Sequence, residues 1–167
     1  MKRSRVTLYL PFVKRHAALG CFGMALVLTL GGCANSSGAR MGLFTTTMPM
    51  VAIVGAEVFA GESVSYIDGT GTIKLKGSSN PWRECDGDFH YESERLGVGT
   101  IRCADGTDAL FQFRALSTLT GYGFGRAKVG DVSFAYGLPL EQAEPYLRVP
   151  PGKKLQRKDN ALLLTDS

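Results

Sequence analysis

The chain has 167 residues and is 44% hydrophobic, which suits a single domain with a packed core. Its formal net charge of +4 comes from residues 1–32, which hold five bases and no acid and leave 14 bases against 15 acids in the rest. A nearly neutral chain lacks the clustered positive charge that nucleic-acid binding requires. We therefore expect no nucleic-acid partner.

The N-terminal segment has the two-part organisation of a secretory signal peptide. The bases lie in residues 1–16, and residues 17–30 (AALGCFGMALVLTL) are almost entirely apolar. These 14 residues are fewer than the roughly 20 that a helix needs to cross a bilayer. We therefore predict that residues 1–32 form a removable signal peptide and not a membrane span.

The signal ends in Leu30-Gly31-Gly32-Cys33, which resembles the lipobox of bacterial lipoproteins. The resemblance implies cleavage before Cys33 and lipidation of that cysteine with acyl chains such as palmitate. Each buried CH₂ group contributes about 0.8 kcal/mol, so several chains hold a protein firmly on a membrane. Ala34 stands where lipoproteins retained at the inner membrane often have Asp. The resemblance thus implies an outer-membrane location, lipid-anchored and facing the periplasm.

After a predicted flexible tether (33–48), the chain reads as antiparallel β structure. The stretch SVSYIDGTGTIKLK (63–76) has two alternating runs around a glycine-rich turn. A two-residue loop at Gly69-Thr70 would pair Tyr66 with Ile73, giving one apolar face and one polar face.

A second hairpin is predicted in ECDGDFHYESERLGVGTIRC (84–103). One register sets four pairs opposite each other: Cys85–Cys103, Asp86–Arg102, Phe89–Gly99 and Tyr91–Gly97. Directly opposed residues in a non-hydrogen-bonded pair lie about 4.5 Å apart at Cα, which is within the disulfide range, and the periplasm is oxidising. We therefore predict a disulfide between Cys85 and Cys103.

A third hairpin begins with GYGFGRA (121–127), in which every second residue is glycine. A loop at Val129-Gly130 would place Tyr136 opposite Gly123, so that an aromatic ring covers a residue without a side chain. Such a ring shields the exposed backbone and recovers part of the stability that glycine costs a strand.

The Gly-x-Gly pattern recurs at Gly69, Gly97 and Gly121, at intervals of 28 and 24 residues. With the aromatic residues between them, these units over residues 69–137 resemble MORN repeats. The resemblance implies an all-β antiparallel meander of stacked hairpins, associated with scaffolding and with protein or lipid contact. A small closed β-barrel is the alternative architecture, because seven or eight strands are enough to form one.

The C-terminal part changes character. PLEQAEPYL (139–147) predicts a short helix, because Pro145 limits it to about two turns. The following RVPPGKKLQRK (148–158) holds five bases, which could meet lipid phosphates or an acidic partner, although we favour a solvated tail. We assign residues 49–148 to the β domain and residues 149–167 to a basic, extended, solvated tail.

Few groups in the mature chain suit catalysis. Its single histidine is His90, and lipidation and the predicted disulfide use all its cysteines. Asp86, Asp88, His90 and Glu92 alternate along one strand about 7 Å apart, so one metal ion needs further ligands from a neighbouring strand. We interpret them as a solvated face, and expect no catalytic residues, no cofactor and no metal.

Two functions lead, and an envelope hydrolase that uses His90 and its acidic neighbours is a third. The first is a lipid-anchored, non-catalytic binding or scaffold module with an envelope protein or polymer as partner; Trp82, Tyr122 and Tyr136 are candidates for its surface, although sheet packing explains most aromatic residues. The alternative is a periplasmic inhibitor of a lysozyme-like cell-wall hydrolase. TLTGYGFGRA (118–127) resembles in part the Ser-Gly-x-x-Tyr loop of the membrane-bound lysozyme inhibitors, but their Trp-containing segment is missing.

Overall fold

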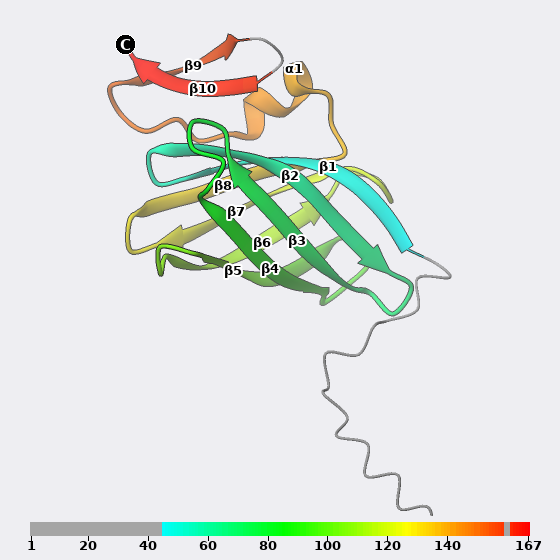
Figure 1. Ribbon diagram of the computed structural model, residues 1–167. Helices are drawn as coiled ribbons and strands as arrows, with labels where there is room; N and C mark the ends of the chain where they lie inside the picture. The colour runs from blue at the N-terminus through cyan, green and yellow to red at the C-terminus, as the bar shows by residue number, and fades with distance from the viewer. Residues whose placement is uncertain (1–44, 159–160) are drawn as a thin grey trace, which may run out of the picture. The chain divides into compact units, whose positions relative to one another are not determined.

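The computed structural model describes residues 45–158 and 161–167. Eight antiparallel strands follow one another around a closed barrel, in which β1 also pairs with β8 (Figure 1). The strands are β1 (Thr45–Val54), β2 (Glu57–Tyr66), β3 (Thr70–Gly77), β4 (Glu84–Tyr91), β5 (Leu96–Cys103), β6 (Asp108–Ala115), β7 (Gly121–Ala127) and β8 (Gly130–Tyr136). The all-β class and the antiparallel meander are confirmed. Of the two expected architectures, the chain adopts the closed barrel and not the open row of hairpins.

Side chains alternate between the inside and the outside of the barrel, as the period of a strand requires. The inner face of β7 consists of three glycines, Gly121, Gly123 and Gly125. A Cβ atom added at Gly123 would clash with the ring of Phe134, and one added at Gly121 would clash with the ring of Tyr136. The glycines thus leave the space that the aromatic rings of the core occupy.

The register predicted for the second hairpin is confirmed in all four pairs. The register predicted for the first hairpin is wrong, because Val64 lies opposite Thr72 and Ser65 opposite Gly71. The loop has three residues: Gly69 has a φ of 77°, and the Asp68 carboxylate accepts a hydrogen bond of 2.9 Å from the Thr70 amide.

As a consequence, the serines of β2 point into the barrel. Ser63 is buried, and its hydroxyl has no hydrogen-bond partner among the described residues. Ser65 lies on the same inner face and lines a cavity at this level of the barrel. The expectation that this strand presents its apolar residues inward is therefore wrong for β2 beyond Phe59.

The third hairpin is displaced by two residues from the predicted register. Phe134 pairs with Gly123 and Tyr136 with Gly121, around a loop of Lys128 and Val129. Gly130, with a φ of 134°, follows the loop, so glycine takes the unusual backbone conformation and Val129 is not required to. A shift of two residues keeps every side chain on its face, so the rings still cover glycines.

The boundaries of the β domain differ from those predicted. Strand β1 begins at Thr45, inside the range 33–48 expected as a tether. The short helix is confirmed as α1 (Leu140–Ala143), continued by the 3-10 turn η1 (Glu144–Tyr146). The segment 149–167 is not an extended tail, because it forms a hairpin of β9 (Lys153–Lys158) and β10 (Ala161–Asp166).

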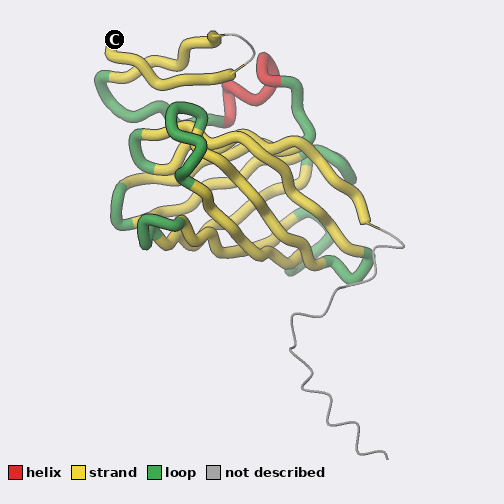
Figure 2. The backbone as a smooth tube through the Cα atoms, viewed as in Figure 1, coloured by secondary structure: helices red, strands yellow, loops and turns green. Residues whose placement is uncertain are grey.

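A second apolar core explains why the C-terminal segment folds. Val51, Ile53 and Val58 point outward from the barrel and pack in one cluster with Ala143, Leu147 and Leu162. Leu155 and Leu164 pack against this cluster from the facing strands of the hairpin. The helix and the hairpin form a layer over one side of the barrel, as Figure 2 shows. The basic residues of the hairpin thus lie on β9, whose one leucine, Leu155, packs against the cluster.

Candidate functional site

The two ends of the barrel differ in the elements that they carry. One end, here called the Trp82 end, holds the β1–β2, β3–β4, β5–β6 and β7–β8 turns. The other, the Thr45 end, holds the start of β1 and the β2–β3, β4–β5 and β6–β7 turns, and the described chain begins there (Figure 1).

The predicted disulfide is present and lies inside the barrel. The Cα atoms of Cys85 and Cys103 are 3.9 Å apart across the β4–β5 pair. Both residues belong to the buried core and are at most 8% exposed. The bridge therefore ties two neighbouring strands and is shielded from solvent, which suits a structural role.

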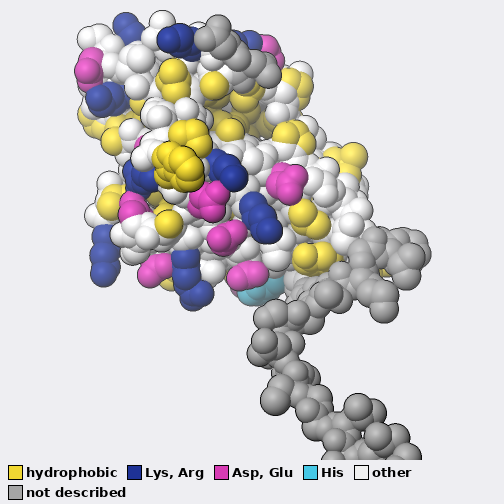
Figure 3. Space-filling model, viewed as in Figure 1, with side chains coloured by type: hydrophobic (Ala, Val, Ile, Leu, Met, Phe, Trp, Pro, Cys, Tyr) yellow, Lys and Arg dark blue, Asp and Glu magenta, His cyan; other side chains and the backbone are white. Residues whose placement is uncertain are grey.

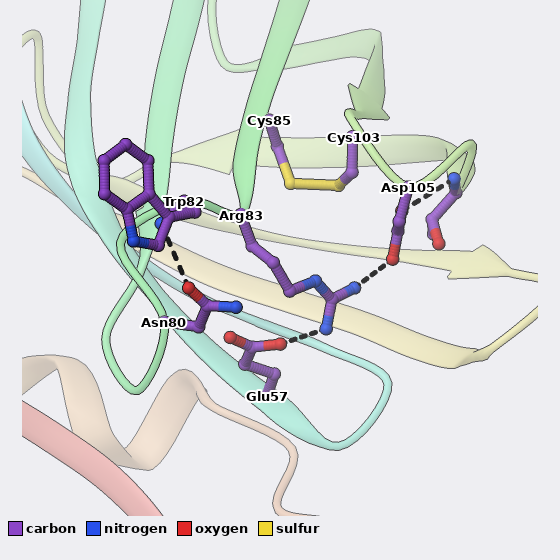
Figure 4. Close-up of polar contacts among 8 residues, drawn as sticks. Glu57, Asn80, Trp82, Arg83, Cys85, Cys103 and Asp105 are labelled. Atoms are coloured by element: carbon purple, nitrogen blue, oxygen red, sulfur yellow. Dashed lines mark hydrogen bonds and ion pairs between the residues drawn. A yellow bond between two sulfur atoms is a disulfide. The ribbon is translucent and has the colours of Figure 1, made fainter.

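Arg83 connects three turns beside this disulfide (Figure 4). Its guanidinium forms ion pairs with the carboxylates of Glu57, at the start of β2, and Asp105, in the β5–β6 turn. It also lies over the Phe59 ring, 5.5 Å from the centroid. A single forked cation thus holds the Trp82 end together.

The Asp105 carboxylate has a second structural role. It accepts a hydrogen bond of 2.9 Å from the backbone amide of Thr107. Hydrogen bonding from Thr107 lowers the pKa of Asp105, and the charge of Arg83 adds to the effect. Asp105 therefore remains ionised at neutral pH and stabilises both its own turn and Arg83.

Trp82, next to Arg83, is the single tryptophan of the chain and is 89% exposed. Its backbone amide donates a hydrogen bond of 3.2 Å to the Asn80 side chain, and the Arg83 amide donates one of 3.0 Å to the Asn80 carbonyl. Pro81 fixes the backbone between them. In Figure 4 the indole ring points away from the Arg83 contacts. A loop with its own hydrogen bonds therefore presents a large aromatic side chain to solvent.

The other two aromatic candidates do not form an exposed surface. Tyr136 lies inside the barrel and is 6% exposed. Burial raises the pKa of the Tyr136 hydroxyl, and the nearby Tyr91 adds to the rise, although the two hydroxyls do not meet hydrogen-bond geometry. The Tyr122 ring stacks on Tyr146 at 4.5 Å, beneath the C-terminal layer. Of the three, Trp82 is exposed, Tyr122 is partly buried and Tyr136 is buried.

The outer wall carries rows of charges in alternation. Successive strands from β2 to β6 place these residues opposite one another: Glu62, Lys74, Asp86, Arg102 and Asp108. Figure 3 shows acidic and basic side chains interspersed on this wall. Opposite charges on adjacent strands favour the observed register, so this row has a structural explanation.

The acidic face of β4 lies on this same wall. Asp86, Asp88 and His90 are exposed, and Glu92 follows the end of the strand. Within residues 45–158 and 161–167, no three His, Cys, Asp or Glu side chains are grouped so as to hold a metal ion.

The barrel interior leaves little room for a ligand. A cavity of about 20 Å³ lies beside Ser63, Tyr136 and the rings of Phe89 and Phe113. This volume is enough for about one water molecule. A larger molecule therefore does not fit inside the closed barrel, although an open hollow of about 1210 Å³ lies at the Thr45 end, lined by residues that include Tyr66, Tyr91 and Leu116.

Cys33, the predicted lipidation site, lies outside the described residues. None of the helices in the described part of the chain has the length and apolar character needed to span a bilayer. Comparison of the chain with protein-family models, with curated proteins and with solved structures found no match.

Proposed function

We propose that this protein is a lipid-anchored, non-catalytic binding module of the bacterial cell envelope that presents Trp82 to an envelope protein or polymer. The observation that carries the proposal is the 89% exposure of the single tryptophan on a loop fixed at both ends. Its membrane partner is the bilayer reached through acyl chains on Cys33, at the outer membrane with the domain in the periplasm.

An exposed tryptophan on an ordered loop suits binding for energetic reasons. Tryptophan is enriched among the residues that contribute most to interfaces, because its ring buries a large area and its indole N–H can still donate a hydrogen bond. The loop loses little conformational entropy on binding because Asn80 and Arg83 already hold it. Nothing in the packing of the barrel requires the ring to face solvent.

The direction of the loop also fits an anchored protein. Thr45 lies 12 residues after Cys33, and a segment of that length spans at most about 40 Å. Trp82 lies at the end of the barrel opposite to Thr45. An anchor on Cys33 would thus hold the Thr45 end nearer the membrane and direct Trp82 away from it.

The test is recovery of partners from cross-linked envelopes, using the full-length lipidated protein as bait. The wild type should recover a reproducible protein or polymer, and Trp82→Ala should reduce recovery by roughly tenfold or more, as expected for an interface hot spot. Leu110→Ala is the matched control, because Leu110 is 73% exposed on the outer wall of β6. Equal recovery by Trp82→Ala, or no reproducible partner for the wild type, would contradict the proposal.

Anchoring is tested separately by labelling cells with a palmitate analogue. The wild type should incorporate label at Cys33 and float with outer-membrane vesicles. Cys33→Ser should lose both properties without losing the folded barrel, since Cys33 lies 12 residues before β1. A wild-type protein that carries no label and retains residues 1–32 would contradict a lipoprotein.

A further inference from the structure

Four exposed aliphatic side chains lie at the Thr45 end, in or beside the turns that surround the barrel opening. Ile67 in the β2–β3 turn is 81% exposed, and Leu119 in the β6–β7 turn is 50% exposed. Leu96 at the start of β5 and Leu116 after β6 are 48% and 41% exposed. We call these four residues the apolar rim.

Formed turns hold the apolar rim in place. The Ser117 hydroxyl accepts hydrogen bonds from the backbone amides of Leu119 and Thr120, at 3.2 and 3.1 Å. The Leu96 carbonyl accepts a 2.8 Å hydrogen bond from the Glu92 amide, which closes the β4–β5 turn. These hydrogen-bonded turns therefore hold Leu96 and Leu119 exposed, and four exposed aliphatic side chains on one end of a domain are candidates for an interaction surface.

The chain itself indicates what this surface meets. The described chain begins at Thr45 on the same end of the barrel, and only 11 residues lie between Cys33 and Thr45. We propose that the apolar rim rests in the lipid surface to which Cys33 is anchored, with Ile67 and Leu119 inserted among the lipid headgroups. This inference rests on the proposed lipidation. A short tether raises the effective concentration of the rim at the bilayer, so four aliphatic side chains suffice for docking.

The charges around the rim select the type of lipid. Glu92 and Glu94 lie beside Arg95 in the β4–β5 turn, so acids outnumber bases there. Such a turn gains nothing from an anionic surface, which attracts clustered Lys and Arg. The occupant is therefore a surface of zwitterionic phospholipid, and added anionic lipid should weaken the docking.

Single-tryptophan fluorescence tests the docking in the full-length lipidated protein, reconstituted in vesicles of zwitterionic phospholipid with brominated acyl chains. Trp82, on the opposite end, is the internal reference, and its emission should not be quenched. In Trp82→Phe/Leu119→Trp the single tryptophan lies in the rim, about 5–10 Å into the interface, and should be quenched roughly twofold. The matched control is Trp82→Phe/Val129→Trp, because Val129 is 54% exposed in a turn at the Trp82 end.

The outcomes separate this inference from the proposed anchor. Quenching at position 119 and none at position 129 supports docking. Protein that floats with the vesicles but is not quenched at position 119 is anchored without docking, which overturns the inference alone. A blue-shifted but unquenched tryptophan at position 119 means that protein covers the rim and also overturns it. If the full-length protein with Cys33 intact does not float with the vesicles, both proposals are wrong.

Discussion

The Phe113 ring lies across the backbone of Gly97 on the inner wall of the barrel, where a Cβ atom on Gly97 would overlap the ring. Phe111 has the same relation to Gly99, and Phe134 to Gly123. Several of these rings also meet edge to face, as Phe111 and Phe134 do at 4.9 Å. The narrow barrel is filled by rings that only glycine on a neighbouring strand can accommodate.

Gly97→Ala should therefore destabilise the barrel. We expect a loss of about 1–3 kcal/mol, the usual cost of extra volume in a packed core, measured by chemical denaturation of the mature chain carrying Cys33→Ala. Combining Gly97→Ala with Phe113→Leu should recover part of the loss, because the leucine withdraws from the space above position 97. Recovery will be incomplete, since the His90 carbonyl also lies close to that space. Strictly additive effects of the two substitutions would contradict the proposed contact.

Loss of the interior disulfide should lower the free energy of unfolding by an amount comparable to that expected for Gly97→Ala. The bridge joins residues 18 positions apart, and loss of a crosslink over a loop of that size costs about 3 kcal/mol. Cys85→Ala/Cys103→Ala should lower the unfolding midpoint accordingly. A reductant should lower the midpoint of the wild type and leave that of the double variant unchanged. Equal midpoints for the wild type and the double variant would show that the bridge adds no stability.

Arg83→Ala should open the Trp82 end of the barrel. It leaves the Glu57 carboxylate, whose side chain is only 15% exposed, without its cation. Removing one member of a buried pair costs about 3–5 kcal/mol, and we expect about 1–3 kcal/mol here because Arg83 is partly exposed.

Two variants distinguish this ion pairing from simple loss of packing. Arg83→Lys should be less stable than the wild type, because an ammonium group cannot reach both carboxylates as the guanidinium does. Glu57→Gln in the Arg83→Ala background should restore part of it by removing the unpaired charge. Full stability of Arg83→Lys in thermal unfolding would show that the fork is not required.

The domain should not inhibit c-type lysozyme at micromolar concentration. Most of the segment 118–127, on which the resemblance to lysozyme inhibitors depends, lies in β7. Its glycines face the filled interior, and Tyr122 stacks on Tyr146. A turbidity assay with the soluble domain measures this directly. Inhibition in that range would favour the alternative function.

Local rules predicted the parts of the fold that depend on neighbouring residues. The two-residue period identified the hairpins β2–β3, β4–β5 and β7–β8 but not β1, β9 or β10. The requirement that Cys85 and Cys103 lie opposite each other fixed one register completely. The turn after β2 was misjudged because the Asp68 side chain shapes a three-residue loop that the glycine alone does not specify. The register of β7 was ambiguous because a repeated Gly-x-Gly allows a shift of two residues without changing faces.

Contacts between residues that are distant in the chain could not be predicted from local sequence patterns. Closure of the barrel requires β1 to pair with β8, and no local sequence pattern predicts this pairing. Arg83 was missed because its partners, Glu57 and Asp105, are 26 and 22 residues away in the chain. Sequence patterns made Trp82, Tyr122 and Tyr136 equal candidates for a binding surface. The structure distinguishes them, because Trp82 is exposed, Tyr136 is buried and Tyr122 stacks on Tyr146.

Photo-cross-linking in living cells tests the whole account most directly. The full-length protein would carry p-benzoylphenylalanine in place of Trp82 or, separately, of Leu119. We expect a discrete adduct with an envelope protein or polymer from position 82, and lipid adducts from position 119. Lipid adducts from position 82, or the same protein adduct from both positions, would contradict a barrel that faces the membrane with one end and its partner with the other.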